Sequence, residues 1–477
     1  MKKIAELVFI PSPGVGHLTS ALEMANLLIR RDERIFITFI IMKVPFDTKT
    51  SIHTQSTAED ANSRIRFVEL PHEEPSTEQK SRFHIMTTLI ETNKTRVRDV
   101  AAGIQTNRLA GFVVDVFCSS MIDVADELGI PTYIYFTSSA GFLGLMFHLQ
   151  FIQDDQNKDI IQFKDSDTEL SVPSFANSVP TKVLPSVMLQ NQDECSRFLA
   201  HARRFRRTKG ILVNTFMELE SHAVKSLSDS KTPPIYPVGP VLNLKIGDGS
   251  HQSDAIMSWL DDQPPLSVVF LCFGSLGSFG KEQVKEIADA LERSGYRFLW
   301  SLRQPPPKGK VELPKEYENP QEVLPEGFLE RMAGMGKVIG WAPQVAVLSH
   351  PAVGGFVSHC GWNSTLESVW CGVPMAAWPL YAEQQLNAFE MVRELGLAVE
   401  IKMDFRKDPS RDINQEPLTA EEIETGIRKV MTNDQEIRKK VNEMKEKSRE
   451  AMMEGGSSYI SLGRLIEDVI KSMDFHS

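Results

Sequence analysis

Cysteine is scarce in this chain, and long hydrophobic runs are missing from it. The 477 residues include five cysteines, an odd number at wide spacing and without a CxxC pair. This usage argues against a disulfide framework or a structural zinc site, and it is typical of a protein in a reducing cytosol. No run reaches the roughly 18 apolar residues of a membrane helix, so we expect no membrane span. We therefore expect a cytoplasmic protein.

The sequence also lacks a recognisable targeting segment. An apolar run at 4–10 follows Lys2 and Lys3, as in a secretory signal, but it is short and contains Glu6. It ends in Pro-Ser-Pro-Gly, with no small-residue cleavage site after it. We interpret this run as the first strand of the fold.

Basic residues are outnumbered by acidic ones. Lys and Arg total 52 against 63 Asp and Glu, which gives a formal net charge of −11. This balance argues against general binding to nucleic acids or anionic membranes, because both need a basic face. A content of 42% hydrophobic and 24% charged residues is typical of a globular protein. At 477 residues, two or three domains are expected.

Apolar strands alternate with amphipathic helices along the whole chain, a pattern that predicts parallel α/β sheets. The helices expected in the first half are at 18–30 and 121–128, and the C-terminal 421–471 is helical with a break at Gly455 and Gly456. The strands expected are at 7–11, 35–42, 111–115, 132–136 and 210–214, then at 267–273, 298–302, 337–339, 354–358 and 375–378.

A segment rich in Pro and Gly, Pro233–Pro240, separates the two series of strands, and a polar linker at 243–253 follows it. We predict an N-terminal domain at 1–242 and a second domain at 254–456, with a terminal segment at 457–477. Two parallel-sheet domains that face each other would place the carboxyl ends of their strands around one cleft, where ligands bind in open α/β folds.

The most informative stretch is 341–384. Within it a strand-like run ends at Ser358, a Gly-rich polar turn follows from His359 to Thr365, and a helix then begins. Free backbone N–H groups and the positive end of a helix point at one place in such a turn, which makes an anion site. We expect the anion to be a diphosphate.

A second Gly-rich turn lies at 11–17 and ends in His17. Gly14 and Gly16 fit a dinucleotide fingerprint, but the third position of that pattern is Thr19, so the fingerprint fails. His17 stands at a strand-to-helix turn, where either a surface histidine or a general base fits. Asp115 ends a later strand, and its carboxylate suits either a helix cap or a functional group at the cleft.

The stretch at 341–384 resembles the donor-binding signature of plant family-1 UDP-glycosyltransferases. The resemblance extends to 11–17, to 210–216 and to Phe273-Gly274-Ser275, and the N-terminal third is most similar to subfamily 71. The matching positions of the signature are Trp341, Gln344, His359, Gly361, Trp362, Asn363, Ser364, Glu367, Pro374, Glu383 and Gln384.

This resemblance implies a GT-B fold, in which two Rossmann-like domains face each other across a cleft. The N-terminal domain would bind the acceptor, the C-terminal domain would bind UDP-sugar, and the helix in 457–477 would pack back on the N-terminal domain. The implied reaction is inverting transfer of glucose from UDP-glucose to a hydroxyl. His17 matches the general base, and Asp115 matches the acid that holds it.

The resemblance also assigns the donor site. Trp341 would stack on uracil beside Ala342, and Gln344 and Glu367 would bind the ribose. The diphosphate would be held by His359, Asn363, Ser364 and Ser275, and the sugar by Trp362, Glu383 and Gln384. Gln384 at the end of the signature favours glucose, because a His there goes with galactose more often in this family.

The acceptor is expected to be a small lipophilic plant metabolite, either a phenolic such as a flavonoid or a terpenoid. An apolar and adaptable wall fits such a molecule, although the same side chains also fit an ordinary core. The residues expected in this wall are Phe117, Met121, Phe142, Leu145, Met146, Met188 and Phe198.

Several further features have an alternative interpretation. The DxD sequence of Asp165 and Asp167 holds a metal in another class of glycosyltransferase, but here it lies in a polar run, so we expect no metal and no cofactor. The basic cluster 203–207 is interpreted as an exposed helix face rather than a patch for an anionic partner.

We expect a monomer. The alternative functions are a UDP-sugar-binding protein without catalysis and a nicotinamide oxidoreductase.

Overall fold

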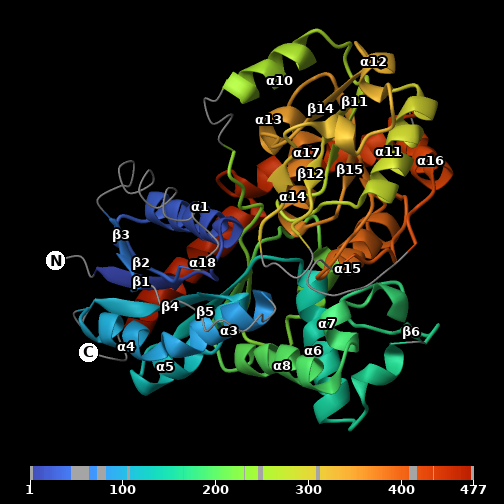
Figure 1. Cartoon of the computed structure of the whole chain (residues 1–477). Helices are drawn as coiled ribbons and strands as arrows, with labels where there is room; N and C mark the ends of the chain where they lie inside the picture. The colour runs from blue at the N-terminus through green and yellow to red at the C-terminus, as the bar shows by residue number, and fades with distance from the viewer. Residues whose placement is uncertain are drawn as a thin grey trace.

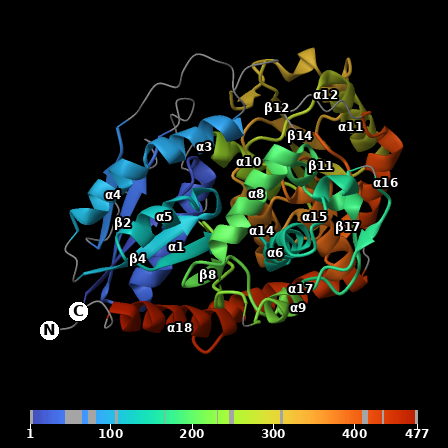
Figure 2. The same ribbon diagram turned by 90° about the horizontal axis from the view of Figure 1, so that it is seen from below.

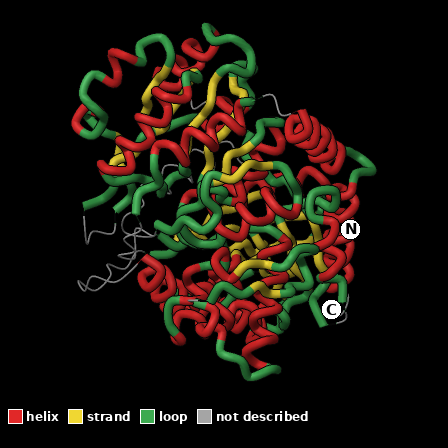
Figure 3. Tube along the Cα trace, turned by 90° about the vertical axis from the view of Figure 1, so that its right-hand side faces the viewer, coloured by secondary structure: helices red, strands yellow, loops and turns green. Residues whose placement is uncertain are grey.

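Two parallel β-sheets, each covered by helices, form the main body of the computed structural model (Figure 1). The strands gather into two groups with helices around each (Figure 3). This arrangement confirms the predicted α/β fold with two Rossmann-like domains. The structure describes residues 4–43, 64–71, 82–104, 108–164, 166–229, 231–244, 251–307, 312–407, 416–432 and 435–473.

The first sheet has seven strands in the order β3-β2-β1-β4-β5-β8-β9. Its central strands are buried almost throughout, as expected for a parallel sheet with both faces covered. The strands are β1 (Ala5–Ile10), β2 (Ile35–Ile41), β3 (Ile65–Glu69), β4 (Leu109–Asp115), β5 (Thr132–Phe136), β8 (Gly210–Val213) and β9 (Ile235–Pro237).

Alternate residues of β1 belong to two different cores. Leu7 and Phe9 pack with residues of α1 (Val15–Arg31), whereas Val8 and Ile10 pack on the other face of the sheet. The alternation follows from the two-residue period of a strand. The other helices of this half are α3 (Arg82–Thr92), α4 (Lys94–Ala102), α5 (Met121–Glu127), α6 (Ala140–Asp154), α7 (Ser186–Leu189), α8 (Gln192–Phe205) and α9 (Ser221–Ser226).

The second sheet has six strands in the order β14-β11-β10-β15-β16-β17. They are β10 (Val268–Cys272), β11 (Arg297–Ser301), β14 (Gly336–Ile339), β15 (Val353–Ser358), β16 (Met375–Ala377) and β17 (Ala398–Glu400). Its helices are α10 (His251–Asp261), α11 (Lys281–Ser294), α12 (Phe328–Arg331), α13 (Gln344–Leu348), α14 (Trp362–Cys371), α15 (Gln384–Phe389), α16 (Ala420–Met431) and α17 (Gln435–Met452). Because α10 begins at His251, the predicted linker at 243–253 overlaps its first turn, and residues 245–250 lie outside the described part of the chain.

The last helix, α18 (Ser457–Ser472), packs on the first sheet although it follows the second in sequence (Figure 2). Its buried residues Leu465 and Ile466 belong to the same core as Leu7. Tyr236 of β9 donates a hydrogen bond to Asp468 at 2.6 Å. The C-terminal helix therefore joins the two halves of the molecule a second time.

Candidate active site

The carboxyl ends of neighbouring strands bring His17 and Asp115 together. His17 lies in the first turn of α1, just after β1, and Asp115 is the last residue of β4, which pairs with β1. The His17 Nδ1 atom is 2.9 Å from Asp115 Oδ2. Topology therefore produces a contact between residues that are 98 positions apart.

The Asp115 carboxylate is held on both of its oxygens. Oδ1 accepts a short hydrogen bond from the Ser12 hydroxyl and a bond of 3.3 Å from the backbone N–H of Phe117. Asp115 therefore caps the short helix that follows β4, one of the two alternatives for it, and it also contacts His17. The Asp115 side chain is 2% exposed and that of His17 is 32% exposed. The acid is thus enclosed while the imidazole remains accessible.

The pKa of His17 is raised from its ordinary value. Burial lowers it, but the charge of Asp115, the hydrogen bond to Asp115 and the charge of Glu383 raise it by more. With Nδ1–H donating to the carboxylate, the assigned tautomer leaves Nε2 free to accept a proton. His17 and Asp115 can therefore act as a base and its partner.

The second half supplies an anion site at the start of α14. β15 ends at Ser358, and the first backbone bond of the helix runs from Thr365 N to Gly361 O. The N–H groups of the preceding residues, Trp362 to Ser364, are free to point at a ligand. Asn363 is exposed, Ser364 is nearly buried, and Ser275 is exposed in the turn after β10.

His359 is enclosed beside this helix end. A Cβ atom on Gly274 or Gly361 would lie 2.6 Å or 2.5 Å from His359 Nε2, so both glycines leave room for the ring. Burial lowers the pKa of His359 to about 4, which keeps the imidazole neutral. Its Nδ1 atom is buried without a partner in the described part of the chain. A neutral histidine still carries one N–H that it can donate to a phosphate.

The two residues expected at the ribose are in contact. Gln344 Nε2 donates to Glu367 Oε2 at 2.6 Å and to Ser364 Oγ at 2.8 Å. Burial raises the pKa of Glu367 to about 7, although the hydrogen bond from Gln344 acts in the opposite direction. These three side chains form one polar cluster next to the anion site.

Trp341 is a large apolar side chain on the surface, at 42% exposed. Its backbone N–H donates to Glu316 Oε1 at 2.9 Å, and the Arg303 guanidinium lies 5.3 Å from its ring centroid. An exposed ring held in this way suits stacking on a flat ligand. Ala342 is buried beside it.

Glu383 and Gln384 lie where the two halves meet. Glu383 Oε1 accepts a hydrogen bond of 3.1 Å from the Ser138 hydroxyl of the first half. Gln384 is 4% exposed, and its Oε1 accepts from the N–H groups of Leu380 and Tyr381 at 2.9 and 3.1 Å. The Gln384 amide is therefore fixed with its NH₂ group directed away from those N–H groups. A solvated loop amide would show neither the burial nor these bonds.

The Trp362 side chain has a structural contact of its own. It is 2% exposed, and its indole N–H donates to the Asn214 carbonyl oxygen at 2.7 Å. Sequence reasoning missed Asn214, as it missed Ser12 and Ser138. Ser12 lies within the same Gly-rich turn as His17, which was the available signal. Ser138 acts through a contact between the two halves, for which the sequence has no signal, whereas Asn214 lies within the stretch at 210–216 that shares the resemblance.

The residues expected in the acceptor wall divide into two groups. Phe117, Phe142 and Phe198 keep some exposed surface and form ring contacts, with centroids 6.0 Å apart for Phe142 and Phe198. The other four are fully buried in the core of the first half, so they line no accessible surface in this structure: Met121, Leu145, Met146 and Met188.

The other polar clusters of the sequence have local partners. Asp167 is exposed and pairs with Lys182 at 2.6 Å, while Asp165 lies outside the described residues. Arg203 pairs with Asp154, and Arg207 pairs with Asp123 and Asp126. Within the described ranges there is no group of three or more His, Cys, Asp or Glu side chains arranged for a metal ion. None of the described helices is long and apolar enough to cross a membrane.

Comparisons with known proteins agree with this geometry. The family model described as "UDP-glucoronosyl and UDP-glucosyl transferase" matches residues 248–448. A protein named putative UDP-glucose flavonoid 3-O-glucosyltransferase 3, from Fragaria ananassa, is 56% identical over 98% of this chain and 100% of its own length. UDP-glycosyltransferase 71E1 from Stevia rebaudiana is 57% identical over 98% of each chain.

Solved structures show the same fold. A transferase from Siraitia grosvenorii in complex with UDP has a TM-score of 0.88 at 51% identity, and the match covers 98% of this chain and 100% of that one. UGT71G1 from Medicago truncatula, complexed with UDP-glucose, has a TM-score of 0.87 at 45% identity over 98% of each chain.

Proposed function

The chain belongs to the plant UDP-glycosyltransferase family and is a glycosyltransferase of the GT-B fold; from this premise, we propose that it transfers glucose from UDP-glucose to a hydroxyl of a small lipophilic metabolite. The product is a β-O-glucoside, formed with inversion at the anomeric carbon. The observation that carries the proposal is the contact of 2.9 Å between His17 and Asp115 at the carboxyl edge of the first sheet.

In the proposed reaction, His17 Nε2 takes the proton of the acceptor hydroxyl while the oxygen attacks the anomeric carbon. The bond between that carbon and the diphosphate oxygen breaks, and UDP leaves. Asp115 stabilises the imidazolium that forms. The start of α14, together with His359, Asn363, Ser364 and Ser275, stabilises the charge on the departing diphosphate. These donors supply the electrostatic stabilisation, so we propose that no metal is required.

We assign the halves of the chain accordingly. Residues 1–242 bind the acceptor, 254–456 bind UDP-glucose, and 457–477 tie the second half back to the first. Uracil stacks on Trp341 beside Ala342, and the ribose is held by Gln344 and Glu367. The glucose hydroxyls contact Glu383 and Gln384 next to Trp362.

For the acceptor we propose a flat phenolic of the flavonoid class. A relative that is 56% identical is named a flavonoid 3-O-glucosyltransferase, and Phe117 lies edge-on to His17 with ring centroids 5.7 Å apart. Phe142 and Phe198 extend the aromatic surface. We propose that the enzyme is a cytoplasmic monomer.

Replacement of His17 by Ala tests the reaction. We expect glucosyl transfer to an ordinary hydroxyl to fall by a factor on the order of 10²–10⁴, which is typical for loss of a general base. UDP binding should stay nearly intact, because His17 belongs to the first half. Asp115→Asn should also lower transfer. Wild-type protein that binds UDP-glucose but glucosylates none of a panel of hydroxylated acceptors would instead be a UDP-sugar-binding protein without catalysis.

A further inference from the structure

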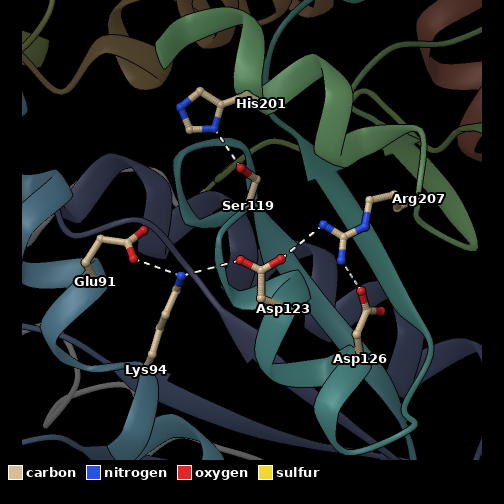
Figure 4. A network of polar contacts seen from close by, with 7 residues as sticks. All are labelled: Glu91, Lys94, Ser119, Asp123, Asp126, His201 and Arg207. Carbon is tan, nitrogen blue, oxygen red and sulfur yellow. Dashed lines mark hydrogen bonds and ion pairs between the residues drawn. The ribbon is translucent and has the colours of Figure 1, made fainter. Parts of the chain in front are cut away.

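A second histidine is buried near the proposed base. His201 lies on α8, and its Nδ1 atom is 2.7 Å from the hydroxyl of Ser119, which follows β4 closely (Figure 4). His201 is 9% exposed and Ser119 is fully buried. Two residues after that helix ends, Arg207 pairs with Asp123 and Asp126 of α5 (Figure 4). The position of the ring is therefore well fixed.

Only one of the two nitrogens of the His201 ring forms a hydrogen bond within the described residues. Burial, followed by the charge of Arg204, lowers the pKa of His201 to about 4, so the ring is neutral near pH 7 and carries one donor and one acceptor. Nδ1 forms a hydrogen bond with the Ser119 hydroxyl, and the second nitrogen, Nε2, points away from Ser119 (Figure 4). Nε2 has no hydrogen-bond partner within the described ranges, and this atom is not fully buried. A small part of its surface is therefore exposed, in agreement with the 9% exposure of His201.

The Phe117 ring contacts both His201 and the proposed base His17. It lies edge-on to His17, with centroids 5.7 Å apart, and edge-on to His201, with centroids 6.2 Å apart. The separation of the two imidazoles is thus at most the sum of these spacings. The charge of Asp115 acts on both histidines, which agrees with their closeness. A planar molecule on Phe117 with one hydroxyl at His17 would extend toward His201.

We propose that His201 is an acceptor-specificity residue whose Nε2 hydrogen-bonds a second polar group on the acceptor, while Ser119 holds the ring. The acceptors favoured by this contact are planar phenolics with two or more hydroxyl or carbonyl groups. Terpenoids lack the planar ring system, and phenols with a single hydroxyl and no carbonyl lack the second group. The proposal rests on the proposed function, since it concerns the acceptor of the same reaction.

The test compares His201→Phe with wild type on two stilbene-type acceptors that share one planar skeleton without a carbonyl group, one with several hydroxyls and one with a single hydroxyl. Phenylalanine keeps an aromatic ring beside Phe117 and Phe198 and removes both ring nitrogens, together with the hydrogen bond to Ser119. We expect kcat/KM to fall about tenfold or more for the polyhydroxylated acceptor, the scale of one buried hydrogen bond. For the acceptor with one hydroxyl, kcat/KM and the KM for UDP-glucose should both change less than about twofold.

Ser119→Ala provides the second variant, because it frees the ring without replacing it. It should cause a smaller loss that is also confined to the polyhydroxylated acceptor. Equal losses on both acceptors, or no loss on either, would overturn the role of His201. Wild-type transfer to the acceptor with one hydroxyl reports on the glycosyltransferase activity independently. If wild type glucosylates neither molecule nor any other hydroxylated acceptor, the proposed function itself fails, and this role fails with it.

Discussion

The Trp362 indole donates a hydrogen bond to the Asn214 carbonyl oxygen across 148 positions of the chain. Trp362 is the first residue of α14 in the second half, and Asn214 directly follows β8 of the first half. Asn214 is itself held, since its side-chain oxygen accepts from Val241 N at 2.7 Å and its amide donates to Val241 O at 3.2 Å. The start of α14 is thereby tied to the segment that leaves the first domain.

Trp362→Phe should weaken both stability and donor binding. Phenylalanine preserves most of the apolar contact but leaves the Asn214 carbonyl oxygen buried without this donor, at a cost of about 1–3 kcal/mol. We expect a lower free energy of unfolding and a weaker affinity for UDP-glucose, measured by denaturant unfolding and by calorimetric titration. Trp259→Phe is the matched control, because its indole N–H has no partner in the described part of the chain. Equal behaviour of the two variants would show that the hydrogen bond does not couple the halves.

Most strands of the fold could be predicted because they are apolar runs bounded by turn residues. The strand expected at 132–136 coincides with β5, and the runs at 35–42 and 354–358 differ from β2 and β15 by one residue. The strands that were missed have weaker patterns. β9 lies inside the Pro-rich segment that was assigned to the end of the first domain, and an edge strand tolerates proline because one of its sides needs no partner. β17 has only three residues.

The site could be predicted only in part, and the division has a physical cause. His17 and His359 lie at strand-to-helix turns, where the local sequence signals a polar group at the cleft, and Glu367 follows within α14. The contact between Ser138 and Glu383 joins residues 245 positions apart and depends on how the halves pack. The same holds for the bond between Trp362 and Asn214. Four of the seven residues predicted to line the acceptor site are fully buried, because apolar type alone does not distinguish a pocket wall from a core.

Gly361→Ala should reduce donor binding through His359. The φ of Gly361 is −62°, so alanine adds no backbone strain, but its Cβ would lie 2.5 Å from His359 Nε2. The ring must move away from the anion site, and we expect the affinity for UDP to fall by about tenfold or more, the scale of one hydrogen bond to a charged group. Gly463→Ala on α18 is the control, because its Cβ would approach only Arg31, at 3.5 Å. Unchanged UDP affinity in Gly361→Ala would remove His359 from the phosphate site.

The affinity for UDP-glucose should rise with pH through about 7. Burial raises the pKa of Glu367 to about 7 in the free protein, so its carboxyl is partly protonated at neutral pH. Ribose hydroxyls donate best to the ionised form, and binding should therefore strengthen as the proton is lost. UDP-glucose is the suitable probe, because its phosphates are diesters without an ionisation near neutrality. Titrations from pH 5.5 to 8.5 should show this rise in wild type, and Glu367→Gln should show a flat profile. A rise of the same size in the variant would assign the effect to another group.

We expect the choice of donor sugar to depend on the way in which Gln384 is held. Its Oε1 is occupied by the N–H groups of Leu380 and Tyr381, so the NH₂ group is left as a donor to the sugar. The neighbouring Glu383 carboxylate offers acceptors, and the pair can distinguish the hydroxyl orientation by which glucose differs from galactose. We therefore expect UDP-glucose to be used better than UDP-galactose.

Gln384→Glu separates the sugar contact from the structural one. The carboxylate can still accept from Leu380 and Tyr381 N–H, but it has no NH₂ group to donate, and a sugar hydroxyl left unpaired costs roughly 1–3 kcal/mol. Transfer from UDP-glucose should fall by about tenfold or more, whereas the inhibition constant of UDP, which lacks the sugar, should hardly change. UDP thus serves as the internal control for folding and for the nucleotide site. Gln384→Ala removes both contacts and should lower transfer at least as much. If Gln384→Glu transfers glucose as well as wild type, Gln384 only supports the turn that begins at Leu380, and the sugar must be selected by other groups.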